Sequence, residues 1–169
     1  MTMEAQDRIL DRQAMADQCA EWREAGQTVV FTNGVFDLLH RGHVTYLEAA
    51  ARLGDVLVVG VNDDASVRRL GKGDDRPIVP EADRAFVVAG LRSVAGVILF
   101  GEDTPLELIQ AVQPDVLVKG GDYDADCTDS ADPRYIVGSA EVRANGGRVS
   151  TIDLVPGRST TAIAAKLKG

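Results

Sequence analysis

Short apolar runs alternate with segments of helical spacing along most of this chain. The apolar runs predict strands at residues 28–32, 56–61, 96–100, 116–118 and 148–152. Helical spacing, with its start and stop signals, predicts helices at residues 44–53, 65–70, 81–91, 105–112, 132–145 and 159–167. Because the two kinds of element alternate, crossover helices are expected to join parallel strands. We therefore predict an α/β fold, a Rossmann-like doubly wound sheet of five parallel strands in a single domain.

The length of the chain, 169 residues with 45% hydrophobic content, suits one domain with a substantial core. We assign residues 26–169 to this domain and residues 1–25 to an N-terminal helical extension. Residues 7–25 are predicted to form an amphipathic helix. Its apolar positions, Leu10, Ala14, Cys19 and Trp22, are expected to pack on the domain or on another subunit.

Charge and cysteine content restrict the possible partners and the compartment. A net charge of -8 argues against a general nucleic-acid-binding surface, so a polyphosphate ligand would need local cations, dipoles or Mg²⁺. Cys19 and Cys127 do not make a disulfide framework, and we expect two unpaired thiols. The sequence has no long apolar span and no basic, apolar N-terminal signal, which predicts a cytoplasmic protein without a membrane partner.

The two histidines of the chain, His40 and His43, flank Gly42 where a predicted strand turns into a helix. In an open parallel sheet, ligands bind beyond the carboxyl ends of the strands, where a helix N-terminus offers unpaired N–H groups to a phosphate. Imidazole N–H groups there can also stabilise the charge that develops when a nucleotide phosphorus is attacked. The simpler interpretation is an i, i+3 pair with ordinary capping or surface roles.

A hydroxyl cluster, Ser159-Thr160-Thr161, stands at the predicted start of the last helix. Ser159 is a suitable N-cap, and helix capping alone would explain it. Opposite the histidine turn, the cluster could instead donate hydrogen bonds to the β- and γ-phosphates of a nucleoside triphosphate. Whether Arg158, directly before the cluster, reaches that triphosphate stays open at this point.

Two glycine-containing loops add further candidates. Lys119-Gly120-Gly121-Asp122-Tyr123 follows a predicted strand, and its glycines would let a ligand lie against the backbone, although an ordinary loop is the alternative. The polar segment 71–80 is predicted to be a mobile loop, and it carries Lys72 between two glycines. Arg76 and Arg84 are either surface charges or ligands of an acceptor phosphate.

These motifs resemble a known family. His40-Arg41-Gly42-His43, preceded by Thr32-Asn33-Gly34-Val35-Phe36-Asp37, resembles the HxGH signature of the cytidylyltransferase-like nucleotidyltransferase superfamily. From about Gly26 onward the chain is most similar to adenylyltransferases that act on D-glycero-β-D-manno-heptose 1-phosphate, the second domain of bifunctional heptose kinase/adenylyltransferases, here in a stand-alone form. The resemblance also rests on Gly60-Val61-Asn62-Asp63-Asp64, Arg76-Pro77-Ile78, Glu102-Asp103-Thr104-Pro105, Pro114-Asp115-Val116-Leu117-Val118 with the loop after it, and Ser159-Thr160-Thr161.

The resemblance implies roles for individual residues. His40 and His43 would stabilise the pentavalent state, and Lys72 would bridge the α-phosphate and the acceptor phosphate. Nucleotide-binding roles are implied for Thr32, Asn33, Gly34, Phe36, Gly42, Gly120, Asp122, Tyr123, Ser159, Thr160 and Thr161. Substrate-binding candidates are Asp37, Arg76, Arg84 and Lys119, and Asp37 would either orient the turn or approach the metal. No residue is expected to bind metal directly, and Mg²⁺ would act as cofactor through the nucleotide phosphates.

The resemblance also implies the substrates. Cytidylyltransferases of the superfamily tend to carry Gly-Asp-Asp-Trp and Arg-Thr-Glu-Gly-Ile where this chain has Gly120-Gly121-Asp122-Tyr123 and Leu154-Val155-Pro156-Gly157-Arg158, which favours ATP over CTP. The expected reaction transfers AMP to the heptose 1-phosphate and gives ADP-heptose for lipopolysaccharide cores. A homo-oligomer is expected, together with a separate upstream sugar kinase.

Three alternatives remain. The first is the same chemistry on another acceptor, such as glycerol 3-phosphate with CTP, or pantetheine phosphate or a flavin with ATP. The second is a non-catalytic nucleotide sensor, against which the pair of histidines, Lys72 and Thr160 argue. The third is a zinc site made by the two histidines and the two cysteines, although Cys19 and Cys127 lack paired spacing.

Overall fold

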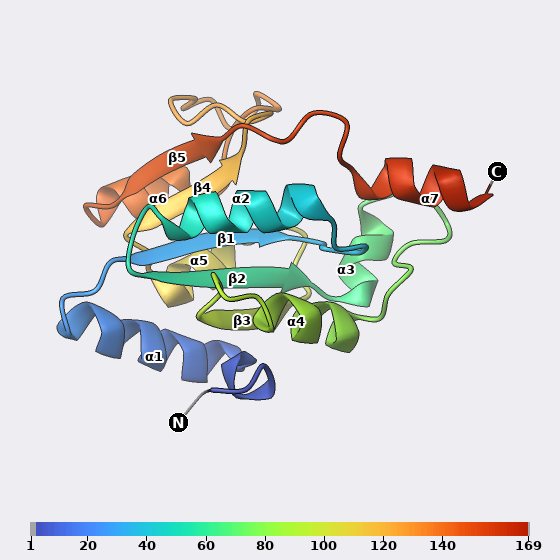
Figure 1. The fold of residues 1–169 in the computed structure, drawn as a ribbon. Helices are drawn as coiled ribbons and strands as arrows, with labels where there is room; N and C mark the ends of the chain where they lie inside the picture. Colours follow the sequence, from blue (N-terminus) through green and yellow to red (C-terminus); the bar gives the residue numbers. More distant parts are fainter. Residues whose placement is uncertain (1–2, 169) are drawn as a thin grey trace.

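All five strands are parallel and form one sheet in the order β3-β2-β1-β4-β5 (Figure 1). The structure is a computed structural model and describes residues 3–168. The strands are β1 (Val29–Gly34), β2 (Val56–Asn62), β3 (Gly96–Phe100), β4 (Val116–Gly120) and β5 (Arg148–Ile152). The chain runs outward from β1 to β3 and then returns to β4 on the other side of β1, so β1 and β4 form a topological switch point. The predicted doubly wound α/β sheet is confirmed.

The pairing between β1 and β4 at this switch point is short. β1 pairs with β2 along its whole length, from Val29↔Val56 to Gly34↔Val61. β1 pairs with β4 only at Val30↔Val116 and Phe31↔Leu117. The next residue of β1, Thr32, contacts β4 through its side chain, since its hydroxyl donates to the carbonyl of Val118 at 2.9 Å. The carboxyl ends of β1 and β4 therefore leave room for a ligand.

Helices cover both faces of the sheet (Figure 1). α2 (Arg41–Ala51) and α4 (Glu81–Ala89) pack on one face, in a cluster that includes Leu47 and Val88. α1 (Arg12–Glu24), α5 (Leu106–Val112) and α6 (Ser139–Ala144) pack on the other, in a cluster that includes Met15, Leu108 and Val142. α3 (Asp64–Arg69) and α7 (Thr160–Lys168) lie beyond the carboxyl ends of β1 and β2.

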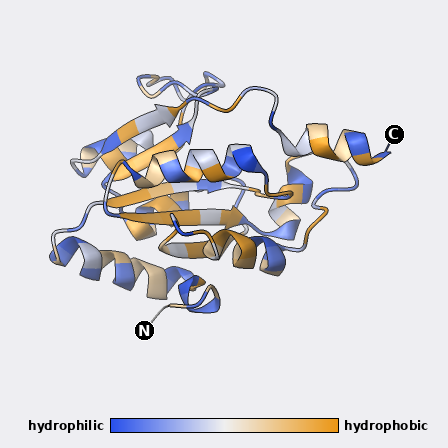
Figure 2. Ribbon diagram, in the orientation of Figure 1, coloured by the Kyte–Doolittle hydropathy of each residue, from blue (hydrophilic) through white to orange (hydrophobic). Residues whose placement is uncertain are grey.

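Hydropathy accounts for this layering. The central strands are apolar along most of their length, whereas the surface helices carry one apolar and one polar face (Figure 2). A strand that is covered on both faces by helices has no solvent-facing side, so it needs apolar residues at successive positions. No helix within residues 3–168 is long and apolar enough to cross a membrane.

The N-terminal segment is not the single helix predicted for residues 7–25. A short 3-10 helix (Gln6–Arg8) comes first, then Ile9 forms a bridge with Val97, and α1 begins after Asp11. The helix begins there because the Asp11 carboxylate accepts the N–H of Ala14 at 2.8 Å, an N-cap that the sequence prediction overlooked. α1 packs on the domain itself: Cys19 is fully buried, and burial raises the pKa of its thiol to about 11.

The helix predicted for residues 132–145 is also wrong in its first half. α6 begins only at Ser139, because Gly138 has a left-handed φ of 87°. Before it, the Asp129 and Asp132 carboxylates accept main-chain N–H groups two residues ahead, from Ala131 and Arg134, which stabilises turns rather than a helix. Residues 135–138 are thereby left as a loop at the carboxyl end of the sheet.

Candidate active site at the switch point

A cavity of about 670 Å³ opens beyond the carboxyl ends of the strands. Its walls come from the β1–α2 turn, the loop after α3, the β3–α5 turn, the end of β4, the segment before α6 and the start of α7. Most of the predicted site residues line it. These are Asn33, Gly34, Phe36, Asp37, His40, Gly42, His43, Lys72, Arg76, Lys119, Gly120, Asp122, Tyr123, Ser159, Thr160 and Thr161.

His40 and His43 form the first turn of α2. His40 is the N-cap, and its Nδ1 accepts the N–H of Gly42 at 3.0 Å, while Nδ1 of His43 accepts the N–H of His40 at 3.3 Å. The rings stack with their centroids 3.9 Å apart. In a neutral imidazole whose Nδ1 accepts a hydrogen bond, the proton is on Nε2. The capping interpretation and the donor interpretation are therefore compatible, because each ring uses one nitrogen for each task.

Both rings favour the neutral form. The pKa of His43 is lowered to about 4, chiefly by burial and then by the neighbouring His40, against the opposing effect of a hydrogen bond to the main chain of Leu38. Burial, and then the charge of Arg158, lower the pKa of His40 as well. Near neutral pH the pair thus offers N–H donors without carrying positive charge.

The start of α7 docks directly on this turn. The hydroxyl of Thr160 donates to the carbonyl of Leu38 at 3.3 Å, and Ser159 caps α7 by accepting the N–H of Ala162 at 3.1 Å. A Cβ added to Gly42 would lie 2.8 Å from Cε1 of His40 and 3.2 Å from Cβ of Arg158. Gly42 therefore permits the close approach of both neighbours. Arg158, whose reach the sequence left open, lines the same cavity.

Two lysines and two arginines supply positive charge around the cavity: Lys72, Lys119, Arg76 and Arg158. Lys72 comes from the loop after α3, and Lys119 from β4, with its Nζ 5.4 Å from the centroid of the Tyr123 ring. The pKa of Lys119 is lowered to about 8, chiefly by burial and then by the charge of Lys72. The two ammonium groups are close enough to influence each other, and an anion between them would relieve that repulsion.

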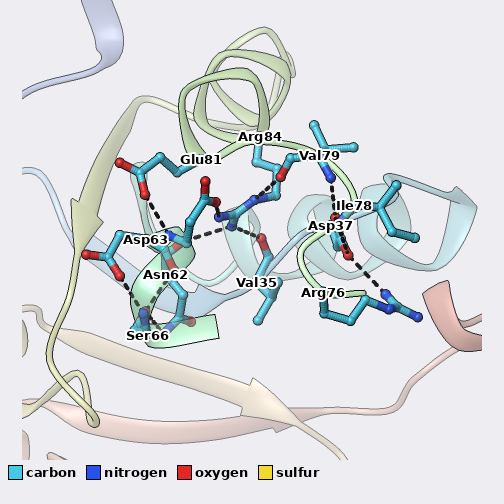
Figure 3. Close-up of polar contacts among 11 residues, drawn as sticks. Val35, Asp37, Asn62, Asp63, Ser66, Arg76, Ile78, Val79, Glu81 and Arg84 are labelled. Carbon is cyan, nitrogen blue, oxygen red and sulfur yellow. Dashed lines mark hydrogen bonds and ion pairs between the residues drawn. The ribbon is translucent and has the colours of Figure 1, made fainter. Parts of the chain in front are cut away.

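Asp37 fastens the loop that carries Arg76 to the β1–α2 turn (Figure 3). Its carboxylate accepts the N–H groups of Ile78 and Val79, each at 2.9 Å, and pairs with Arg76 at 3.0 Å. Burial opposes its ionisation, but these hydrogen bonds outweigh burial and lower the pKa of Asp37. Of its two proposed roles, orienting the turn is the one that these contacts support, since the oxygens already have protein donors.

Arg84 and Thr32 do not line the cavity. The Arg84 side chain is 0% exposed, pairs with Asp64, and donates to the carbonyls of Val79, Val35 and Asn62 (Figure 3). These bonds support a structural role for Arg84 rather than the acceptor-binding role considered from the sequence. The Thr32 hydroxyl lies under the cavity, where it bonds Tyr46 Oη at 2.8 Å. Since Tyr46 lines the cavity, Thr32 contacts the site through that side chain.

Comparison with known proteins identifies the family of this chain. Residues 31–166 match the cytidylyltransferase-like family. The chain belongs to this family. Membership confirms the predicted enzyme class, a nucleotidyltransferase.

Individual relatives are similar over nearly the whole chain. The chain is 52% identical over 161 residues to the bifunctional protein HldE of Methylobacillus flagellatus, and 51% identical over 165 residues to that of Syntrophotalea carbinolica. These matches cover 95% and 98% of this chain but 31% and 32% of those proteins, so the chain spans about a third of their length. A lipopolysaccharide core biosynthesis protein of Thermoplasma volcanium has a similar structure, with a TM-score of 0.58 and 31% identity, covering 77% of this chain and 98% of that one.

Some residues of this cytidylyltransferase-like site were missed by sequence reasoning. They include Tyr46, Asn62, Phe100, Asp103, Thr104, Tyr135 and Leu154. Asn62, Asp103 and Thr104 were quoted as parts of the motifs that carry the family resemblance, but no site role was assigned to them, although a polar turn after a parallel strand is itself a signal for a ligand site. The zinc alternative finds no support, because residues 3–168 contain no group of three or more His, Cys, Asp or Glu side chains suited to a metal ion.

Proposed function

We propose that this protein transfers AMP from ATP to D-glycero-β-D-manno-heptose 1-phosphate, giving ADP-heptose and pyrophosphate for lipopolysaccharide cores. The observation that carries the proposal is the histidine pair at the N-terminus of α2, with both Nδ1 atoms occupied by main-chain N–H groups. The choice of substrates is supported by identity of about one half to the HldE proteins over nearly the whole chain.

In the proposed reaction, an oxygen of the sugar phosphate attacks the α-phosphorus of ATP in line. One phosphorus–oxygen bond forms, and the bond to pyrophosphate breaks. A phosphate monoester is a competent nucleophile near neutral pH, so neither a covalent intermediate nor a general base is required. The Nε2–H groups of His40 and His43 would donate to the oxygens on which negative charge increases in the transition state.

The cations would position the two anionic substrates. Lys72 and Lys119 would offset the repulsion between the α-phosphate and the acceptor phosphate, and such positioning accounts for much of the catalysis in phosphoryl-type transfer. Ser159, Thr160 and Thr161 would bind the β- and γ-phosphates beside Arg158. Because the Asp37 oxygens are already bonded within the protein, Mg²⁺ would be held by the nucleotide phosphates and would neutralise charge on the leaving pyrophosphate.

The nucleotide base and ribose would lie against the end of β4, at Gly120, Asp122 and Tyr123. A Cβ on Gly120 would lie 3.1 Å from Cδ2 of Leu154, so this glycine permits the close approach of Leu154, and both residues line the cavity. ATP and a sugar phosphate are cytoplasmic metabolites, which supports the predicted location. The acceptor must come from a reaction that phosphorylates the anomeric position of the sugar, as the predicted separate kinase would. The homo-oligomer stays a prediction.

The test is pyrophosphate release in the presence of Mg²⁺, with ATP and CTP each combined with heptose 1-phosphate, glycerol 3-phosphate and pantetheine phosphate. We expect pyrophosphate release only with the pair of ATP and heptose 1-phosphate. Release with another pair would keep the nucleotidyltransferase chemistry and overturn the proposed substrates. The variant His43→Ala provides the background rate, and release that persists in this variant would contradict the assignment of the histidine.

A further inference from the structure

One polar atom in the cavity wall lacks a partner. Oδ1 of Asn33 is buried and accepts no hydrogen bond from any of residues 3–168, and Asn33 lines the cavity. Buried side-chain oxygens are nearly always hydrogen-bonded, because an unpaired one costs free energy. An amide held in this state beside a cavity is suited to a ligand that donates a hydrogen bond.

The position of Asn33 separates it from the histidine pair. Asn33 is opposite Gly60 in the register of β1 and β2, and it shares a sheet face with Phe31, two residues before it. A Cβ on Gly60 would lie 3.3 Å from Cβ of Asn33 and 3.0 Å from Cδ2 of Leu108 in α5. Asn33 therefore faces the α5 side of the sheet. His40 and His43 belong to α2, which packs on the opposite face.

The β3–α5 turn supplies further polar groups on the α5 side. Asp103 and Thr104 both line the cavity. Asp103 pairs through Oδ1 with Nε of Arg69 at 2.7 Å, and a carboxylate has further acceptor positions beyond one such contact. Phe100 and Tyr135 also line the cavity and supply aromatic surface. An amide, a carboxylate and a hydroxyl beside aromatic rings suit a neutral polyhydroxylated group, whereas a carboxylate would repel a phosphate.

We infer that Asn33, Asp103 and Thr104 form the subsite for the hydroxyl groups of the acceptor sugar, on the α5 side of the cavity. The acceptor phosphate then lies toward Lys72 and Lys119, and the sugar body extends away from the nucleotide. This inference rests on the proposed function, since it takes the acceptor to be a phosphorylated polyol. It also changes the role of Asn33, which the sequence had assigned to the nucleotide.

The test compares two ligands in two variants. Asn33→Ala removes the unpaired amide, and Thr104→Val removes an exposed hydroxyl with little change in shape. Calorimetry measures the Kd of heptose 1-phosphate and of an ATP analogue with a methylene group between the α- and β-phosphates. We expect the Kd of heptose 1-phosphate to rise roughly tenfold in Asn33→Ala, and less in Thr104→Val, with the Kd of the analogue unchanged.

Matched controls are Asn145→Ala and Thr151→Val, because both residues are exposed and neither lines the cavity. A weaker Kd for the ATP analogue in Asn33→Ala, with the sugar phosphate unaffected, would place Asn33 at the nucleotide and overturn the inference. An unchanged Kd for both ligands in both variants would overturn it too. Thermal unfolding of Asn33→Ala separates loss of the subsite from loss of the fold, and Thr104→Val tests the subsite without altering the core.

A failure of the proposed function can be distinguished from a failure of this inference. If wild-type protein releases pyrophosphate with another acceptor, such as glycerol 3-phosphate, the proposed substrate is wrong. The same variants are then measured with that acceptor and with inorganic phosphate. A selective loss of affinity for the acceptor over inorganic phosphate would support the polyol subsite, and equal affinities in wild type and variants would overturn it.

Discussion

The main-chain N–H of His40 donates to Nδ1 of His43 at 3.3 Å, and the two imidazole rings stack with their centroids 3.9 Å apart. The bond fixes the His43 ring at the N-terminus of α2 and places its proton on Nε2. If the ring turned its other nitrogen inward, the N–H of His40 would lose its acceptor. The helix cap thus orients the group that we assign to catalysis.

Replacing His43 with Asn should separate these two tasks. The amide oxygen of Asn can accept the His40 N–H, but no donor remains at the position of Nε2. We expect kcat to fall by about 10²–10³, with KM for ATP changed little, because one transition-state donor is lost. Steady-state kinetics of His43→Asn beside His43→Ala tests this result. If the asparagine variant retained wild-type turnover while the alanine variant were inactive, capping alone would explain the histidine.

The stability of the fold should depend on His43 at acidic pH. The pKa of His43 is lowered from 6.5 to about 4 in the folded protein, so between these values the unfolded chain binds a proton that the folded chain does not. Stability is therefore lost as pH falls from 6.5 toward about 4, and it is constant in this respect above 6.5. The free energies of unfolding of wild type and His43→Asn, measured in urea, should therefore diverge over that window. Toward pH 4 the wild type should lose about 2 kcal/mol more than the variant, after allowance for solvent screening. If the two free energies changed with pH in parallel, the buried His43 ring would not be neutral in the folded protein.

Lys119 should make substrate affinity depend on alkaline pH. Its pKa is lowered to about 8, so its positive charge is lost as pH rises through that value. We expect KM for the phosphorylated substrates to rise by roughly tenfold by about pH 9, since about a tenth of the lysine is then charged. Lys119→Arg keeps its charge at this pH and should abolish the rise. The same rise in the arginine variant would point to another titrating group.

The sequence predicted the sheet and the phosphate-binding turns because both depend on local patterns. Apolar runs near residues 29, 56 and 116 became central strands, and the HxGH turn follows the first of them as expected. Glycine beside His40 and a hydroxyl cap at Ser159 also act over a few residues. Such short-range signals survive in a single sequence, since the groups that interact are neighbours in the chain.

The errors involve contacts between distant residues. Arg84 looked like a free cation because nothing near it in sequence reveals the Val35 and Asn62 carbonyls, which lie 49 and 22 residues away. The late start of α6 follows from aspartate-stabilised turns and the positive φ of Gly138, and helical spacing does not report either.

Gly42→Ala should damage the active site more than the fold. An added Cβ would lie 2.8 Å from Cε1 of His40, so the ring must move, and movement by about 1 Å near reacting groups can lower turnover on the order of 10²-fold. Gly90→Ala is the matched control, because its nearest neighbour would be 3.4 Å away, an ordinary contact. Pyrophosphate release and thermal unfolding together report the result. Full activity in Gly42→Ala would show that the turn tolerates a side chain.

Arg84→Met tests whether this arginine is structural. Its side chain is 0% exposed and pairs with Asp64 at 2.8 Å, and three main-chain carbonyls accept its other hydrogen bonds. Methionine fills similar space but leaves these acceptors unpaired, so we expect a loss of about 3 kcal/mol in the free energy of unfolding. Arg92→Met, at an exposed position, should cost far less. Below the unfolding transition, KM for the acceptor should match that of wild type. A raised KM in a variant of normal stability would instead return Arg84 to the substrate site.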